Sequence, residues 1–390
     1  MSPRHSLLPR LLAGLDSPGG AMNLAQHLCI HGELPEPAPH ELIEEIEQAG
    51  LRGRGGADFP TARKLRAVAT DGRARRPRAR AGRPSAVIVN GSETEPASAK
   101  DRMLLSRLPH LVLDGAVLAA GGVGAAEVIV TVGQSAHGSL SALDGAIATR
   151  AGGPVPIRVV AAPEGYVTGE ESAVVNYLNA GVSLPTFVPP RPYERGYRGR
   201  PTLILNPETL AQVALIARLG ALWFRELGTT ADPGSVLVTI SGAVRTPGVY
   251  ELAFGTPMTE LLAAAGGSSE PIRALLVGGY FGTWVESSRA FRLRLARDDL
   301  RTVGCSLGSG VLIALGESCC GLHESARVID YLAAESAGQC GPCVRGLRAV
   351  ADSVSALAEG VAEPHEAERL VRWIGDITGR GACHHPNGAV

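Results

Sequence analysis

The chain has 390 residues, enough for two or three domains, and its 45% apolar content excludes wholesale disorder. A formal net charge of −1 argues against nucleic acid as the main partner. The most apolar stretch, residues 111–126, is interrupted by Asp114 and by glycines, which excludes a transmembrane helix. Seven cysteines and no recognisable signal-peptide cleavage site indicate the cytoplasm, where thiols stay reduced and can bind metal.

The N-terminal half alternates helix and strand patterns. Residues 39–50 repeat apolar side chains at helical spacing, and a glycine-rich loop follows them. Buried-strand patterns separated by helical ones predict an α/β fold, a mostly parallel sheet with helices on its faces. The strands are expected at 85–96 (running into a polar turn), 125–133 and 155–163, and the helices at about 101–120, 138–150 and 169–181.

Later segments change character. Residues 71–84 carry six arginines and form a solvated loop or a basic docking patch, and residues 184–202 hold five prolines and form an extended connector. Near 232, two β-rich runs joined by a Thr-Pro-Gly turn and followed by a helix indicate a small β-grasp-like module. From about 318 the pattern is helical.

Two polar motifs of the α/β region suit a cofactor. Gly53, Gly55 and Gly56, with Lys64 beyond them, can offer backbone N–H groups and a positive charge to a phosphate, or can form a plain tight turn. Residues 90–96 end a strand, where open α/β sheets bind ligands, although a solvated turn is equally compatible.

Two further motifs have a structural and a functional reading. Glu170 and Glu171 open a helix, where acidic side chains also act as caps. Cys340 and Cys343 form a C-x-x-C pair with Cys383 further along, which suits a soft metal or an iron–sulfur cluster better than a redox pair, because the surroundings are helical.

Taken in order, these motifs resemble one family. It is the NADH-binding flavoprotein subunit of respiratory complex I (its F subunit, of the 51 kDa type), shared with NAD-reducing hydrogenases and NAD-dependent formate dehydrogenases. The segment around 241–257 resembles its SLBB β-grasp module. The matching motifs are Gly53–Thr61, Lys100–Arg102, Asn90–Pro96, Tyr166–Ala173, Asn206–Leu210 and Glu335–Cys343.

The resemblance implies an electron-transfer flavoprotein, an NADH dehydrogenase that oxidises NADH through FMN and passes single electrons to an iron–sulfur cluster and then to a ferredoxin-like or membrane partner subunit. It implies four parts: an N-terminal extension (1–38), a Rossmann-like FMN- and NADH-binding domain (39–231), the SLBB module (232–317) and a helical iron–sulfur-binding domain (318–390). Its location would be cytoplasmic, peripheral to the membrane only through partners.

The resemblance also assigns residue roles. The glycine-rich loop and Lys64 would hold the FMN phosphate, Phe59 would stack on the adenine of NADH, and Glu95 and Glu171 would contact the rest of NADH. The isoalloxazine and ribityl chain would be lined by Asn90, Glu93, Tyr166, Gly169, Glu170 and Asn206, and the cofactor-binding set also includes Arg54 and Thr209. The cluster ligands would be Cys340, Cys343 and Cys383.

The sequence departs from the family at several positions. Ala337 occupies the place of the first of four cluster cysteines, while Ser92 and Ala67 replace residues near the flavin and the dinucleotide. Three thiolates could hold a [3Fe–4S] cluster, or a [4Fe–4S] cluster completed by another ligand, or the cluster could be lost. The candidates for that ligand are His384, His385, Cys319 and Cys320.

Two other readings remain at this point. These departures would also fit a non-catalytic scaffold or ligand-binding module with a decayed flavin or cluster site. The sequence of residues 90–96 also resembles a motif of the C subunit of the Rnf electron-transport complex, although the ferredoxin-type cysteine runs of that relative are absent.

Overall fold

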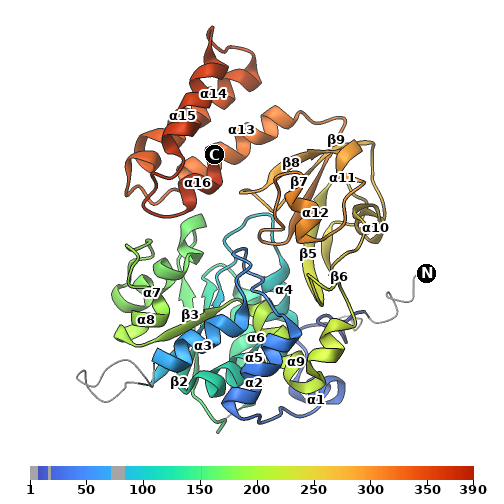
Figure 1. Cartoon of the computed structure of the whole chain (residues 1–390), viewed down its shortest axis with the longest axis vertical. Coiled ribbons are helices and arrows are strands. Elements are labelled where there is room, and N and C mark those ends of the chain that lie inside the picture. Colours follow the sequence, from blue (N-terminus) through green and yellow to red (C-terminus); the bar gives the residue numbers. More distant parts are fainter. Residues whose placement is uncertain (1–7, 16–18, 72–83, 151) are drawn as a thin grey trace.

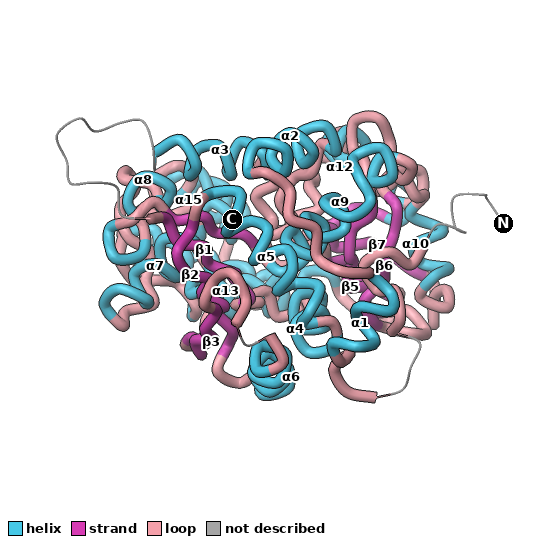
Figure 2. Tube along the Cα trace, turned by 90° about the horizontal axis from the view of Figure 1, so that it is seen from below, coloured by secondary structure: helices cyan, strands magenta, loops and turns pink. Residues whose placement is uncertain are grey.

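The computed structural model describes residues 8–15, 19–71, 84–150 and 152–390, which form three units along the chain (Figure 1). The first unit is built on a four-stranded sheet, the second on a five-stranded sheet, and the third is helical. Figure 2 shows strands β1–β3 and β5–β7 as two separate groups surrounded by helices. This arrangement confirms the predicted fold class.

The first sheet is parallel throughout, with the strand order β3-β2-β1-β4. Ile88 in the central strand pairs with Ile129 on one side and with Ile204 on the other. Runs of β-branched apolar residues are typical of strands that are covered on both faces. Such runs allowed three of the four strands, β1, β2 and β3, to be predicted from the sequence. The strands are β1 (Ser85–Gly91), β2 (Ala125–Gly133), β3 (Ile157–Ala162) and β4 (Thr202–Leu205).

Helices cover this sheet and form the largest apolar core with it. The central contact joins α5 and α9, where a Cβ on Gly115 would lie 1.9 Å from the carbonyl oxygen of Leu210, so that only glycine allows the helices to approach this closely. The helices of the unit are α1 (Leu24–His31), α2 (Pro39–Ala49), α3 (Thr61–Asp71), α4 (Lys100–Arg107), α5 (Pro109–Val123), α6 (His137–Ala148), α7 (Glu171–Ala180), α8 (Pro192–Arg195) and α9 (Pro207–Arg225).

The helix expected over about 101–120 is two helices, α4 and α5, which meet at 97°. Pro109 is the first residue of α5, and Leu108 before it has non-helical backbone angles. A proline disfavours the helical conformation of the preceding residue and cannot donate to the turn before it. Buried leucines lie on both sides of the break, Leu104 and Leu105 in α4 and Leu111 in α5, so the sequence pattern did not reveal the bend.

The second unit has its own core under a mixed sheet with the order β6-β5-β9-β7-β8. The predicted Thr-Pro-Gly turn joins β5 and β6, which pair antiparallel with Ile240 opposite Gly248. The remaining strands were not predicted individually, since each has only four to six residues. The elements are β5 (Ser235–Gly242), β6 (Gly248–Ala253), α10 (Met258–Ala264), β7 (Ile272–Val277), β8 (Thr283–Glu286), α11 (Ser287–Ala290), α12 (Arg297–Arg301) and β9 (Val311–Gly316).

The third unit packs α13 and α14 around a small core that includes Ile329, Leu347 and Ile377. A π-helical turn, Pro342–Gly346, contains Cys343 of the C-x-x-C pair and leads into α14. Its helices are α13 (Gly321–Ala334), α14 (Leu347–Glu359), α15 (Glu366–Ile377) and α16 (His385–Ala389), in agreement with the helical pattern.

Three expectations concern single segments. The proline-rich connector, 184–202, contains the short helix α8 and ends where β4 begins. The arginine-rich loop predicted at 71–84 lies, over 72–83, outside the described residues. Within the described ranges no single helix is long and apolar enough to cross a membrane, and the bent pair α4–α5 alone passes that test when its two helices are taken together.

Candidate active site

The predicted motifs converge at the carboxyl edge of the parallel sheet. Asn90 lies near the end of β1, and Asn206 follows β4 and caps α9 by accepting a hydrogen bond from the Thr209 N–H at 3.2 Å. Asn90 donates through Nδ2 to the Gly169 carbonyl at 2.8 Å. This edge, where helices begin after parallel strands, is the usual ligand-binding edge of an open α/β sheet.

The glycine-rich loop lies against the same edge. A Cβ on Gly55 would sit 3.5 Å from Cβ of Asn206, so the loop backbone passes directly over the start of α9. The Arg54 N–H donates to Thr209 Oγ1 at 2.9 Å, which fixes the loop on the helix. Glycines here leave the backbone open to an anion on the other side.

Lys64 brings a positive charge to this loop from the first turn of α3. Its Nζ donates to the Ile204 carbonyl at 2.9 Å and forms an ion pair with Glu171, at the start of α7. Phe59 is 44% exposed beside it, with the Arg63 guanidinium 5.5 Å from the ring centroid. Lys64 and Glu171 are therefore in direct contact, and Phe59 is exposed just before the start of the same helix, α3.

Glu93 and Glu170 accept hydrogen bonds from backbone N–H groups close to them in the sequence. Glu93 accepts from the Asp101 and Arg102 N–H groups at 3.0 Å, at the start of α4. Glu170 accepts from the Ser172 and Ala173 N–H groups and caps α7. The structural reading of Glu170 as a cap is thus confirmed, and both carboxylates hold helix ends that face the sheet edge.

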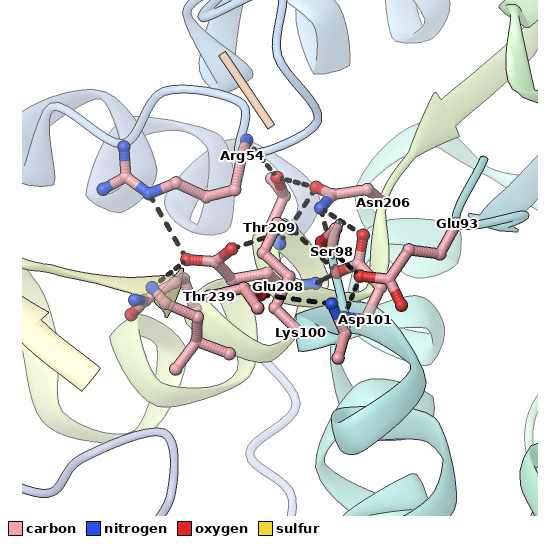
Figure 3. Close-up of polar contacts among 12 residues, drawn as sticks. Arg54, Glu93, Ser98, Lys100, Asp101, Asn206, Glu208, Thr209 and Thr239 are labelled. Atoms are coloured by element: carbon pink, nitrogen blue, oxygen red, sulfur yellow. Dashed lines mark hydrogen bonds and ion pairs between the residues drawn. The ribbon is translucent and has the colours of Figure 1, made fainter. Parts of the chain in front are cut away.

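A buried network of opposite charges lies beneath the loop and fastens it to the rest of the molecule (Figure 3). Lys100 Nζ lies 3.0 Å from both Asp101 Oδ1 and Glu208 Oε2, and Arg54 Nε lies 4.0 Å from Glu208 Oε1. Glu208 is fully buried and also accepts from the Leu237 N–H of β5 at 2.9 Å. The loop, α4, α9 and the second sheet thereby share one set of ion pairs.

The electrostatics of this network favour ionised Lys100. Burial alone would lower its pKa, but the carboxylates of Asp101 and Glu208 raise the pKa above its ordinary value. Burial raises the pKa of Glu208, against the opposing charges of Lys100 and Arg54. With two cations and a backbone N–H on its oxygens, Glu208 has the partners that a buried carboxylate needs.

The second unit contributes to the site through the turn between β7 and β8. The Tyr280 N–H donates to Glu95 Oε2 at 2.9 Å, and the Tyr166 hydroxyl donates to the same oxygen at 3.1 Å. Gly279 has φ +86°, and a Cβ there would lie 2.6 Å from Glu95 Oε2. Burial raises the pKa of Glu95, which is 8% exposed.

This contact was missed by sequence reasoning. The Gly278-Gly279 pair before Tyr280 was its one signal, because consecutive glycines with positive φ mark a close backbone approach. Glu95 itself was predicted, but its two tyrosine partners come from segments more than seventy residues away in the sequence.

Two buried polar atoms at the edge lack hydrogen-bond partners: Asn90 Oδ1 and Ser92 Oγ. A hollow opens beside Ser92, and it is lined by the segments at and after the ends of β1, β2 and β3, among them Glu93, Gly133 and Glu164. Buried polar atoms are normally paired, and unpaired ones mark a site that a ligand or water completes. The edge therefore fits a polar ligand with hydrogen-bonding groups, as FMN is.

The three predicted cluster cysteines lie together in the third unit. Cys340 Sγ and Cys343 Sγ are 3.3 Å apart. Backbone N–H groups face all three sulfurs: that of Ala382 faces Cys340, that of Gly338 faces Cys343, and that of His385 faces Cys383. Amides directed at sulfur are a common means of tuning cluster thiolates.

These sulfurs do not make a site for a single ion. Among the described residues, no group of three or more His, Cys, Asp or Glu side chains has the geometry to hold one metal ion. Burial raises the pKa of Cys343 to about 11. The donor chemistry, soft sulfur with amide support, suits an iron–sulfur cluster, whose cysteines bind different irons.

Comparisons with known proteins decide the family. Family models match residues 46–215 (Nuo51 FMN-binding domain), 237–275 (SLBB domain) and 323–390 (NADH-ubiquinone oxidoreductase-F iron-sulfur binding region). The second F subunit of the NADH-quinone oxidoreductase of Rhizobium meliloti is 30% identical over 98% of this chain and 93% of its own length. The chain belongs to the family of NADH-quinone oxidoreductase F subunits. The F subunit of Rickettsia bellii is 31% identical over 88% of the chain and 84% of its own length.

Solved structures give the same result. An NAD+-reducing [NiFe]-hydrogenase in the H2-reduced state matches 90% of this chain with a TM-score of 0.80 and 31% identity. The air-oxidised state matches 98% with a TM-score of 0.81 and 30% identity. The chain spans 60% and 64% of those hydrogenase chains, respectively.

The family assignment confirms the predictions of recognition, fold class, FMN and iron–sulfur cofactors, and the electron-transfer oxidoreductase function of an NADH dehydrogenase. The relatives are named as subunits, which agrees with the expected partner subunits. The individual roles of the site residues and the limits of the domains stay predictions.

Proposed function

We propose that this chain oxidises NADH at FMN bound on the carboxyl edge of the parallel sheet, and passes electrons through the iron–sulfur region to a ferredoxin-like or membrane redox partner subunit. The family assignment supports this function. The observation that carries the site is that the glycine-rich loop, Lys64, Asn206 and Asn90 meet the carboxyl ends of the neighbouring strands β1 and β4, where Asn90 Oδ1 lacks a partner.

Some residues of this edge would bind FMN and others would bind NADH. The N–H groups of residues 53–56 and Lys64 would bind the FMN phosphate. Asn90 Oδ1 would accept from the flavin, and Asn206 would orient it from the start of α9. Bound FMN supplies hydride acceptance and one-electron release, and the protein supplies position and electrostatics.

On the dinucleotide side, Phe59 offers an exposed aromatic face for the adenine. Glu95 and Glu171 would contact the rest of NADH. Oε2 of Glu95 is held by Tyr166 and Tyr280, and Oε1 accepts the Ala97 N–H at 3.3 Å, so the buried carboxylate has a fixed direction. Cys340, Cys343 and Cys383 would bind the cluster.

The proposal extends to organisation and location. The domain limits stay at 39–231 for the FMN and NADH domain, 232–317 for the SLBB module and 318–390 for the iron–sulfur domain. We place the protein in the cytoplasm, attached to a membrane only through partner subunits, by analogy with the named subunits of the relatives.

Flavin affinity tests the site directly. Lys64→Ala should weaken FMN binding by about 1.5–3 kcal/mol, or about 10- to 150-fold in Kd, because a charged hydrogen bond to the phosphate is lost. Arg66→Ala is the matched control, since it removes a surface cation two residues along the same helix. Released flavin per chain and anaerobic bleaching by NADH are the measurements, and equal FMN affinity in both variants would refute the phosphate assignment.

A further inference from the structure

The iron–sulfur region of this chain offers three thiols where a four-iron cluster has four corners. The matched region, 323–390, contains Cys340, Cys343 and Cys383 and no other cysteine. The backbone N–H of Gly338 faces Cys343 Sγ, so the peptide that joins Ala337 to Gly338 lies against the cluster sulfurs. The residue at 337 therefore borders the site but carries only a methyl group.

The other cysteines cannot supply the missing thiolate. Cys319 and Cys320 lie just before α13, whereas Cys340 lies beyond its other end. The fourteen residues of α13 span about 21 Å, which no side chain crosses. Cys305 is buried in the core of the second unit, and Cys29 lies on α1 of the first.

Two polar side chains near the site, Glu335 and His385, are engaged elsewhere, while His384 beside Cys383 is exposed. Glu335 Oε2 accepts the Tyr166 N–H at 2.8 Å. His385 is buried, its Nε2 lies 2.8 Å from the Leu332 carbonyl, and its ring centroid lies 5.6 Å from that of Tyr166 and 5.5 Å from that of Phe281. These contacts hold the imidazole in the interface between the third unit and the flavin side.

The loop at the missing corner is open to water. Ala337 is half-buried, and Gly338 and Gln339 are exposed. Gly338 has φ +64°, and no atom lies within 4 Å of the place where its Cβ would be. The space beside Gly338, next to Ala337, is thus open to a small molecule from solution.

We propose that the cluster of this chain is held by three thiolates and that its fourth corner, beside Ala337, takes its ligand from solution, either hydroxide or a small thiol. The inference rests on the proposed function, since it assumes that the cluster forms. Without a protein ligand the fourth iron is exchangeable, so the site holds a three-iron cluster once that iron has left.

The test compares the reconstituted full-length chain with Ala337→Cys, and with Ala334→Cys as a control that adds an exposed thiol at the end of α13. Each is treated anaerobically with ferricyanide, a one-electron oxidant. Loss of one electron and one Fe²⁺ from a four-iron cluster leaves three irons and four sulfides. Iron and sulfide per chain, the EPR signal of a three-iron cluster, and uptake of added ⁵⁷Fe²⁺ with dithionite as the electron donor are measured.

We expect the wild type and Ala334→Cys to fall to about three irons per cluster, show the three-iron signal, and regain about one ⁵⁷Fe. Ala337→Cys should keep about four irons and lose that signal. Retention of four irons by the oxidised wild type, with no three-iron signal, would overturn the inference. If His384→Leu or His385→Leu then released iron, that histidine would be the missing ligand.

Failure of the proposed function would look different. A wild-type chain that binds FMN but no iron after reconstitution would overturn this inference and leave the flavin site standing. A chain that holds iron but no FMN would refute the flavin assignment and leave the cluster proposal intact.

Discussion

Removing Lys100 from the buried charge network should destabilise the molecule by about 3–5 kcal/mol, the usual cost of leaving a buried ionic partner uncompensated. Lys100 is 2% exposed and lies 3.0 Å from carboxylate oxygens of both Asp101 and Glu208. Arg54, 4.0 Å from Glu208, offsets part of the loss. Lys100→Met, which preserves the length of the side chain, is therefore expected at the lower end, about 3 kcal/mol.

A variant of Glu208, the ion-pair partner of Lys100, separates the contribution of the ion pair to stability from that of side-chain packing. Glu208→Gln keeps shape and the acceptor for the Leu237 N–H, but leaves Lys100 with Asp101 alone. The double variant Lys100→Met/Glu208→Gln should lose less free energy of unfolding than the two single variants lose together. The difference should be about 0.5–3 kcal/mol, because each single change already breaks the pair that the two residues share.

The assay is thermal unfolding at pH 7, with guanidinium titration as a second measurement. At about 2–4 °C per kcal/mol for a domain of this size, Lys100→Met should lower Tm by about 6–12 °C. Glu47→Gln, which removes an exposed partner of Arg66, is the control and should change Tm by little, since exposed pairs are worth about 0–1 kcal/mol. A Lys100→Met shift as small as the control's, or strict additivity in the double variant, would show that the network does not bind its segments together.

Two further predictions concern the edge of the site and the N-terminal helix. Gly279→Ala would place a Cβ 2.6 Å from Glu95 Oε2 at φ +86°, so it should raise KM for NADH while FMN content stays unchanged, and an unaltered KM would contradict the role of Glu95. His31 and His110 have pKa values lowered to about 4, chiefly by burial. The unfolded chain therefore binds more protons below about pH 6.5, and the free energy of unfolding should fall between about pH 6.5 and 4. Guanidinium midpoints across that window measure the slope, and His31→Leu should reduce it.

The sequence located those parts of the fold that depend on local patterns. The strands over 85–91 and 125–133 are runs of buried β-branched residues, and their periodicity is visible without any partner. Pro109 divides a predicted helix into α4 and α5, because it disfavours the helical conformation of Leu108 before it. The short strand β4 lacked enough residues to show a period at all.

The site residues also fall into those that the sequence predicts and those that only the structure reveals. Glycines, Asn206 and the three cysteines are recognisable in the sequence because each acts through its own segment. The contacts of Glu95 with Tyr280 and of Glu208 with Leu237 join residues whose neighbours in the sequence give no sign of each other. Those pairings follow from the way the second sheet packs on the first unit, and only the structure shows them.

The turn at Tyr166 is where this packing bears on electron transfer. Its hydroxyl donates to Glu95 of the first unit, its ring lies 4.8 Å from that of Phe281 of the second, and its N–H donates to Glu335 of the third. His385, two residues after Cys383, packs on the same ring. One turn thus touches all three units, so its part-buried contacts help to set the distance between the proposed flavin edge and the cysteines. Because electron transfer between the cofactors depends on that distance, the aromatic cluster around Tyr166 is as much part of the working site as the ligands themselves.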